Sequence, residues 1–367
     1  MALVNIKDLV GVLNRVAPGL GAKENDIQAN CFLLSDGHVY TYNDEVSVSC
    51  KLPKGMKGIK CVVQAKEFLQ LLSKMKEEEV DIAMEKDELC LSTRRTKARF
   101  LTESEIKMPV ADIEIPKDFD ELPEDFLYAI KCCLPIVGKD MSKPLSTCIH
   151  FADDKAEVCD VDKAGRYTFK DEYFKKRVFL PGASAKVVSR FDVVDFAVGG
   201  GWIHFGCKDN TIVSARTYYD GQDMADFTHL LNQKGADVAL PKDLAGALER
   251  SGIFADARTG TEGTLEDIYV ELTIGDDWCV LRCDSAIGSY QEKVRVNYEG
   301  PRLVFSTSPE LLLSALEAHR TCEVCENFVK IYDDNFTHIV AVSRPTEKPK
   351  SQTGEVDEEV AKDEMPF

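Results

Sequence analysis

The sequence has no hydrophobic run that approaches the roughly 20 residues of a membrane-spanning helix. Residues 1–16 are apolar only periodically, with Asp8 and Arg15 inside the pattern. We expect this stretch to be a helix of the fold and not a signal peptide. No membrane partner is expected.

Motifs that carry chemistry are also missing. The six histidines are isolated, and the carboxylates are dispersed along the chain. Gly199-Gly200-Gly201 lacks the Lys-Ser/Thr of a phosphate loop and follows a strand pattern, which favours a hairpin turn. Cys322 and Cys325 have metal-site spacing, and Cys279 and Cys283 would complete four ligands, but the first two flank a strand and face opposite sides. We expect no catalytic residue, cofactor or metal.

The composition is that of a soluble chain of two to three domains. The 367 residues are 44% hydrophobic and 29% charged. Thirteen cysteines form no disulfide framework, which favours a reducing cytoplasm. The net charge of −18 argues against a nucleic-acid partner unless cations gather locally.

The stretch Gly58–Leu101 predicts a strand, a helix over 65–76 and three further strands. On the helix, Phe68 and Leu72 share the apolar face, and Lys66 and Lys74 lie on the polar side. The same order returns with helices over 183–191 and 309–319. Repetition at this period is far more specific than any single motif of the chain.

A second series of helices precedes further strand sets. These helices are expected over 5–16, 126–134 and 241–250. The chain therefore predicts an α+β fold of three tandem domains, each with two helix-plus-strands halves. The expected boundaries are 1–119, 120–234 and 235–345, followed by a disordered acidic tail over 346–367.

Basic residues recur on or beside five of the six expected helices. The sixth helix differs, because it carries Glu310 and Glu317. The candidate polyanion-facing residues are Lys7, Arg15, Lys66, Lys74, Lys131, Lys139, Lys186, Arg190, Lys242 and Arg250. An acidic protein that presents basic helices to one space is able to hold a polyanion without binding it tightly.

Several short signatures, in their order and spacing, resemble the bacterial DNA polymerase III β-subunit, the sliding clamp family. They are Thr41-Tyr42-Asn43-Asp44, Asp162 with Gly165-Arg166-Tyr167, Ala245–Arg250 followed by Ser251, and Tyr298-Glu299-Gly300. The similarity covers about residues 1–345, and the departures suggest a divergent member, of the kind a phage encodes.

The resemblance implies a non-catalytic processivity factor of DNA replication. Two copies would join head to tail into a ring-shaped homodimer, with helices around duplex DNA and sheets outside. The ring would tether the DNA polymerase and be placed on DNA by a clamp loader, in the cytoplasm of a bacterial or phage-infected cell.

The resemblance also implies two contact surfaces, and the chain end suggests a third. A pocket for partner peptides, between the second and third domains, would be lined by Tyr167, Leu230, Leu231, Val238, Ile339 and Ala341. The dimer edge would be Ala98, Arg99, Phe100 and Leu101. The final Met365, Pro366 and Phe367 resemble the acidic tip of single-stranded-DNA-binding proteins, although an inert solubilising tail is an equal alternative.

Two other functions remain open at this point. One is a DNA-processing accessory, or a nuclease whose carboxylates bind metal. The other is a structural ring or virion protein built from the same repeats.

Overall fold

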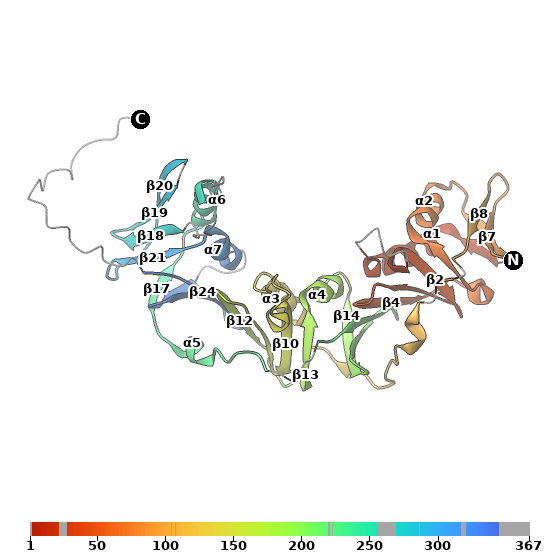
Figure 1. Cartoon of the computed structure of the whole chain (residues 1–367), viewed down its shortest axis with the longest axis horizontal. Coiled ribbons are helices and arrows are strands. Elements are labelled where there is room, and N and C mark those ends of the chain that lie inside the picture. Colours follow the sequence, from red (N-terminus) through yellow and green to blue (C-terminus); the bar gives the residue numbers. More distant parts are fainter. Residues whose placement is uncertain are drawn as a thin grey trace, which may run out of the picture.

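A computed structural model describes residues 2–21, 28–103, 105–106, 108–218, 221, 223–255, 269–285, 287–316 and 321–344. The chain forms an arc with a helix layer on its inner side and sheets on its outer side (Figure 1). The expected tail, with Met365, Pro366 and Phe367, lies outside the described residues. No described helix combines the length and the apolar character needed to cross a membrane.

The described elements form six copies of one unit, in which a short strand and a helix precede three strands. The two units nearest the N-terminus are β1 Ala2–Asn5, α1 Ile6–Val16, β2 Cys31–Ser35, β3 His38–Tyr42, β4 Val46–Lys51, and β5 Cys61–Gln64, α2 Ala65–Lys74, β6 Glu79–Glu85, β7 Glu88–Ser92, β8 Lys97–Leu101. The middle two are β9 Asp120–Glu121, α3 Phe126–Cys133, β10 Cys148–Asp153, β11 Lys155–Cys159, β12 Lys163–Thr168, and β13 Phe174–Pro181, α4 Gly182–Val188, β14 Val193–Gly199, β15 Trp202–Cys207, β16 Ile212–Arg216.

The last two units follow a short linker helix, α5 Thr228–Asn232, on the outer side of the arc (Figure 1). They are β17 Ala236–Ala239, α6 Leu244–Ala255, β18 Val270–Gly275, β19 Trp278–Ser285, β20 Gly288–Arg295, and β21 Leu303–Thr307, α7 Pro309–Leu316, β22 Thr321–Val324, β23 Phe328–Tyr332, β24 Phe336–Ala341. This arrangement confirms the expected α+β class with three tandem domains of two halves each.

The first strand of each unit pairs within the sheet of the other unit of its domain. Thus β1 pairs with β6, and β5 pairs with β2. The exchange interlocks the two halves of a domain. Four-stranded sheets result at the two ends of the arc, in the orders β1-β6-β7-β8 and β20-β19-β18-β21.

Neighbouring domains share continuous sheets. The last strand β4 pairs with β16, and the last strand β12 pairs with β24, which gives two eight-stranded sheets. We call these pairings the first and second internal junctions. Backbone hydrogen bonds therefore run without interruption from one domain into the next.

Each helix lies against its sheet through an apolar stripe. In α1, Leu9 and Leu13 are fully buried, and the Asn5 side chain caps the helix by accepting from the Asp8 N–H at 3.2 Å. In α2, the buried residues are Ala65, Phe68 and Leu72. The opposite faces of these helices are left on the inner side of the arc (Figure 1).

Several elements differ from expectation. The sequence of the first half of the third domain predicts strands over 268–272 and 278–281, but this half also contains β17 and β20. Residues 105–120, with Pro109 and Pro116, predict an irregular connector, which in the structure ends at β9. The helix α5 is not predicted from the sequence. The helix from Pro309 ends at Leu316 among the described residues, and Glu317 lies outside them. The Gly199–Gly201 turn is confirmed, with positive φ at Gly200 and Gly201.

Candidate functional site

The basic side chains identified from the sequence lie on or beside helices of the inner layer of the arc. All ten, from Lys7 to Arg250, are exposed. They lie on or close to α1, α2, α3, α4 and α6. Lys139 follows α3, Arg190 lies beyond the end of α4 at Val188, and Lys242 precedes α6. The expectation that Arg190 sits within the helix one turn after Lys186 is therefore wrong.

Three of the ten cations are held by carboxylates. Arg15 Nε lies 2.8 Å from Asp209 Oδ2, and Lys139 Nζ lies 3.9 Å from Glu310 Oε1. Arg250 makes two hydrogen bonds to Glu292, at 2.7 and 3.0 Å.

The other seven have no ion-pair partner in the described part of the chain. They are Lys7, Lys66, Lys74, Lys131, Lys186, Arg190 and Lys242. Six of these seven residues lie in the first two domains, and only Lys242 lies in the third.

A cavity of about 740 Å³ opens on the inner side between α3, α4 and α7. Lys186 and Arg190 line it together with Lys163, which sequence reasoning missed. Lys163 lies on β12 and donates from Nζ to the Pro135 carbonyl oxygen at 2.7 Å. Burial lowers the pKa of Lys163. A lysine within a strand gives no helical-periodicity signal, and for this reason it was not recognised.

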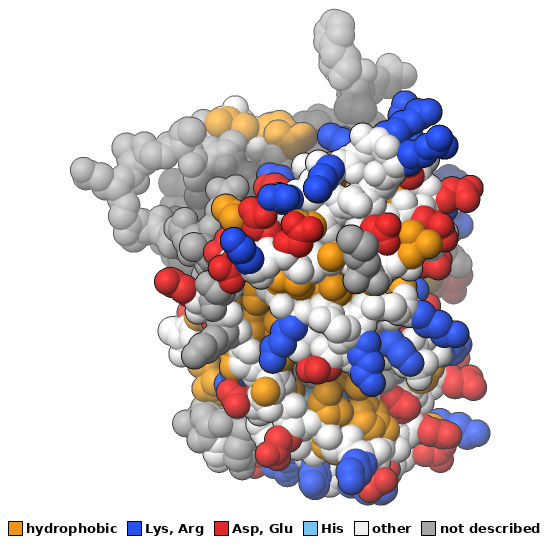
Figure 2. All heavy atoms as spheres, turned by 90° about the vertical axis from the view of Figure 1, so that its right-hand side faces the viewer, with side chains coloured by type: hydrophobic (Ala, Val, Ile, Leu, Met, Phe, Trp, Pro, Cys, Tyr) orange, Lys and Arg blue, Asp and Glu red, His pale blue; other side chains and the backbone are white. Residues whose placement is uncertain are grey.

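Within the described residues, the last strand at each end of the arc has no partner strand on one side. Of the six last strands, β4, β16, β12 and β24 pair across internal junctions, whereas β8 and β20 are sheet edges. On β8, Lys97, Arg99 and Leu101 are exposed, and Ala98 and Phe100 are half-buried. Figure 2 shows this end of the molecule, where exposed hydrophobic side chains lie among acidic and basic ones.

The opposite edge, β20, was missed because its sequence is mostly polar. Tyr290, Glu292 and Val294 point to the helix side, and Gln291 and Lys293 are exposed. Edge strands of this kind present unpaired backbone N–H and C=O groups to a partner strand.

The outer surface of the second internal junction carries a small apolar cluster. Phe227 and Ile339 are buried in it, and Leu230 and Leu231 pack against it. Ala341 lies opposite Phe328, a buried member of this cluster, in the β23–β24 pair. The expected pocket lining is thus partly assembled here.

Two residues of the expected lining lie elsewhere. Tyr167 is 1% exposed and sits in the main core on the helix side of β12, where its hydroxyl donates to Asp125 Oδ2 at 2.6 Å. Val238 is 2% exposed in the core of the third domain. Neighbouring residues of a strand face opposite sides, and Ala164, not Tyr167, is the β12 residue that reaches the outer cluster.

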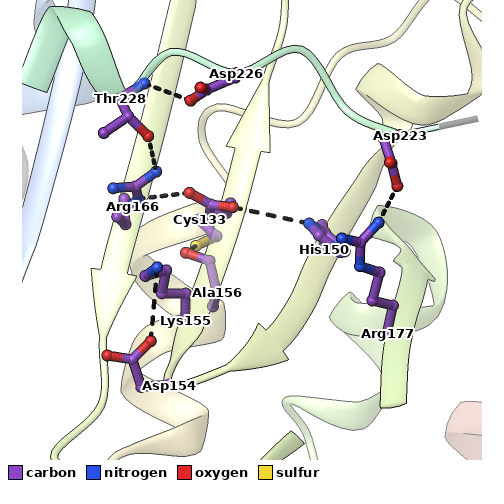
Figure 3. Close-up of polar contacts among 11 residues, drawn as sticks. Cys133, His150, Asp154, Lys155, Ala156, Arg166, Arg177, Asp223, Asp226 and Thr228 are labelled. Atoms are coloured by element: carbon purple, nitrogen blue, oxygen red, sulfur yellow. Dashed lines mark hydrogen bonds and ion pairs between the residues drawn. The ribbon is translucent and has the colours of Figure 1, made fainter. Parts of the chain in front are cut away.

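Polar side chains fasten the linker before α5 to the second domain (Figure 3). Arg166 pairs with Glu157 at 2.5 Å and donates to Thr228 Oγ1 at 2.8 Å, and its guanidinium lies 5.4 Å from the Phe227 ring centre. Arg177 forms an ion pair with Asp223 of the same linker.

A buried ion pair fastens the other end of this linker to the third domain. Lys330 Nζ lies 2.5 Å from Glu323 Oε2 and donates to the Gln233 carbonyl oxygen at 2.6 Å. Burial alone would raise the pKa of Glu323, but the hydrogen bond and charge of Lys330 outweigh it and hold this pKa below its ordinary value. The linker is therefore fixed across the junction by charged groups at both ends.

At the first internal junction the corresponding linker is held by apolar contacts. Met108 packs with Tyr42, Val62 and Trp202 in a buried cluster. Arg216 covers the Trp202 ring at 4.8 Å. Both internal junctions are thus closed on their outer side by a linker of the chain itself.

The expectation that the side chains of Cys322 and Cys325 face opposite sides is confirmed. Cys322 lies in the core of the third domain, and Cys325 belongs to the outer cluster on the opposite face. Within the described residues, no group of three or more His, Cys, Asp or Glu side chains is placed to hold a metal ion.

Solved structures share this architecture over nearly the whole chain. The β subunit from the DNA polymerase of Streptococcus pyogenes superposes with a TM-score of 0.78 at 15% identity, covering 94% of this chain and 99% of that one. The fold is that of the bacterial sliding clamp. The DNA polymerase III β subunit from Thermotoga maritima gives 0.75 at 15%, and the DNA polymerase sliding clamp from Bacillus subtilis gives 0.76 at 16%, both with the same coverage. Comparisons of the sequence with protein-family models and with curated proteins find no match.

Proposed function

We propose that this protein is a DNA sliding clamp, a non-catalytic processivity factor that encircles duplex DNA and tethers a DNA polymerase. The observation that carries the proposal is the arc itself, which has helices on its inner side and, among the described residues, an edge strand with one free side at each end. Two such arcs, joined β8 to β20 at both ends, close a ring of six domains. The similar solved structures are of DNA polymerase clamps, which supports this assignment.

The charge distribution fits a ring that holds DNA without gripping it. The chain has a net charge of −18, and seven cations of the inner surface are not neutralised by a described ion pair. A phosphate backbone in the hole would meet local positive charge, although the chain as a whole is acidic. Retention then depends on closure of the ring and only weakly on affinity.

The outer surface of the second internal junction is the proposed docking surface for partner peptides. Leu230, Leu231, Ile339 and Ala341 are the expected lining residues that lie there, and Ala164 and Phe227 join them. Peptides of the polymerase, of a clamp loader and of other DNA-processing proteins are the proposed occupants. The setting is the cytoplasm of a bacterial or phage-infected cell.

The division at 1–119, 120–234 and 235–345 stays part of the proposal. The short strand β9 at Asp120–Glu121 supports the first boundary, because it pairs with β14 of the second domain. The hydrogen bond from Lys330 Nζ of the third domain to the carbonyl oxygen of Gln233 supports the second boundary.

Loading onto nicked circular DNA tests the mechanism directly. Protein placed on the circle by a loader should remain bound through gel filtration and be lost when a restriction enzyme linearises the circle. Equal retention on circular and linear DNA would contradict topological binding. Sedimentation should give a mass near twice the chain mass of 40.9 kDa, and a monomer at micromolar concentration would contradict the ring.

A further inference from the structure

The six units can be aligned by their middle strands, β3, β7, β11, β15, β19 and β23. In each, the fourth residue pairs with one residue of the last strand. In the first unit of each domain that partner is Val48, Gly165 or Glu292. In the second unit it is Ala98, Val213 or His338.

Both internal junctions then follow one register. Val48 lies opposite Val213 at the first junction, and Gly165 lies opposite His338 at the second. These four are the aligned positions, although the residue types differ. The register is therefore a property of the unit and not of particular side chains.

We infer that β8 of one copy and β20 of a second copy pair in this same register, with Ala98 opposite Glu292 and Phe100 opposite Tyr290. The inference deepens the proposed ring and rests on it. On the outer face, the same register places Arg99 opposite Gln291 and Lys97 opposite Lys293.

The side chains at the two edges suit this register. Phe100 contacts Phe68 edge-on at 5.4 Å between ring centres, and Tyr290 lies 5.4 Å from Phe254. Pairing Phe100 with Tyr290 joins these two contacts into one aromatic row across the interface.

The inferred β8–β20 junction between two copies differs from the first internal junction in the residues at its centre. Val48 and Val213 are buried apolar residues, whereas Glu292 is an acid held by Arg250 from α6 and by the Tyr290 hydroxyl. Pairing of β8 with β20 therefore places Glu292 and its partner Arg250 beside Ala98, and it places Lys97 opposite Lys293. Like charges in opposite positions destabilise a strand pair, so this junction is weaker than the first internal one.

Cysteine pairs on the outer face measure the register without touching the aromatic row or the Arg250–Glu292 pair. Directly opposite residues have Cα atoms about 4.5–5.5 Å apart, within disulfide range, whereas positions two residues along are about 7–8 Å apart. Full-length protein carrying Arg99→Cys and Gln291→Cys should give covalent dimers under mild oxidation faster than Arg99→Cys with Ser289→Cys or with Lys293→Cys. The single variants control for the native thiols.

The possible outcomes test the strand register and the existence of the ring independently. Faster linking of either shifted pair, or a dimer in solution that none of the pairs links, overturns the register and leaves the ring standing. Absence of a dimer at any concentration contradicts the proposed function itself.

A second arm tests the Arg250–Glu292 pair. Arg250→Met leaves Glu292 without its cation at the interface and should raise the dimer dissociation constant about 10- to 100-fold. Adding Glu292→Val, the residue type of position 48, should restore dimerisation. An unchanged constant in Arg250→Met, or no recovery in the double variant, contradicts the role of the pair.

Discussion

The two internal junctions have the same strand register, but their outer sides are closed in different ways. At the first, Met108 and its neighbours pack on Trp202, so closure depends on apolar burial. At the second, the linker is held by Arg166 at one end and by Lys330 at the other. Apolar burial is non-directional, whereas buried ion pairs depend on geometry. The linker of the second junction is therefore held by charged groups in addition to apolar burial, because Phe227, Leu230 and Leu231 also pack there.

Removal of Trp202 should lower the stability of the protein most, because it breaks the apolar cluster that holds the linker at the first junction. Trp202 is 6% exposed, and Trp202→Ala should lower the free energy of unfolding by about 4 kcal/mol in urea denaturation. Trp278, the matched control, is 38% exposed, and its replacement by Ala should cost about 1 kcal/mol or less. Similar losses in the two variants would contradict the apolar account of the first junction.

Removal of Lys330 breaks the charged closure. Lys330→Met leaves Glu323, whose side chain is 8% exposed, buried without its partner, and should cost about 3 kcal/mol. Lys234 also lies near Glu323, at 3.6 Å, but its side chain is 87% exposed, so Lys234→Met should cost about 0.5 kcal/mol or less. Hydrogen exchange should report the loss in β23 and α5. Protection there that matches the unchanged protein would refute the role of the buried pair.

Acid should distinguish the junctions through two buried histidines. Burial lowers the pKa of His204 on β15 from 6.5 to about 4, so the folded protein keeps this imidazole neutral while the unfolded chain takes up a proton. The free energy of unfolding is therefore unaffected by His204 above pH 6.5, and it should fall by about 2–3 kcal/mol as the pH drops toward 4. His204→Gln should flatten the stability profile in that range.

The second junction should respond less to the corresponding change. Burial also lowers the pKa of His150, but the charge of Glu157, 3.8 Å away, opposes the shift. We therefore expect His150→Gln to flatten the profile less than His204→Gln. A larger effect of His150→Gln than of His204→Gln on the pH profile would contradict this expectation.

The smallest effect is expected on the inner side of the first junction. Arg15 and Asp209 form an ion pair whose side chains are 40% and 41% exposed. Arg15→Ala should cost about 0.5 kcal/mol, less at high salt, and Lys7→Ala, without a described partner, should cost about nothing. A loss above about 2 kcal/mol for Arg15→Ala would mean that this pair, and not the apolar linker, holds the junction.

The sequence predicted the repeated helices and most long strands, because apolar residues at helical or alternating spacing persist over enough positions, as in α2 and β6. It did not predict β1, β9 and β17, which have two to four residues and too few positions to show a period. It also missed β20, where Glu292 takes the position that Val48 and Val213 hold in two other units. Tyr167 was assigned to the wrong side because sequence alone does not reveal which face of β12 meets the helices.

The most direct test of a ring around DNA uses the Arg99→Cys, Gln291→Cys variant on a nicked circular plasmid. Oxidation after loading should close both interfaces covalently, and the protein should then migrate with the circle in the presence of SDS and be released by a single restriction cut. Release of the cross-linked protein by SDS while the circle is intact would contradict the central claim that the chain encircles DNA.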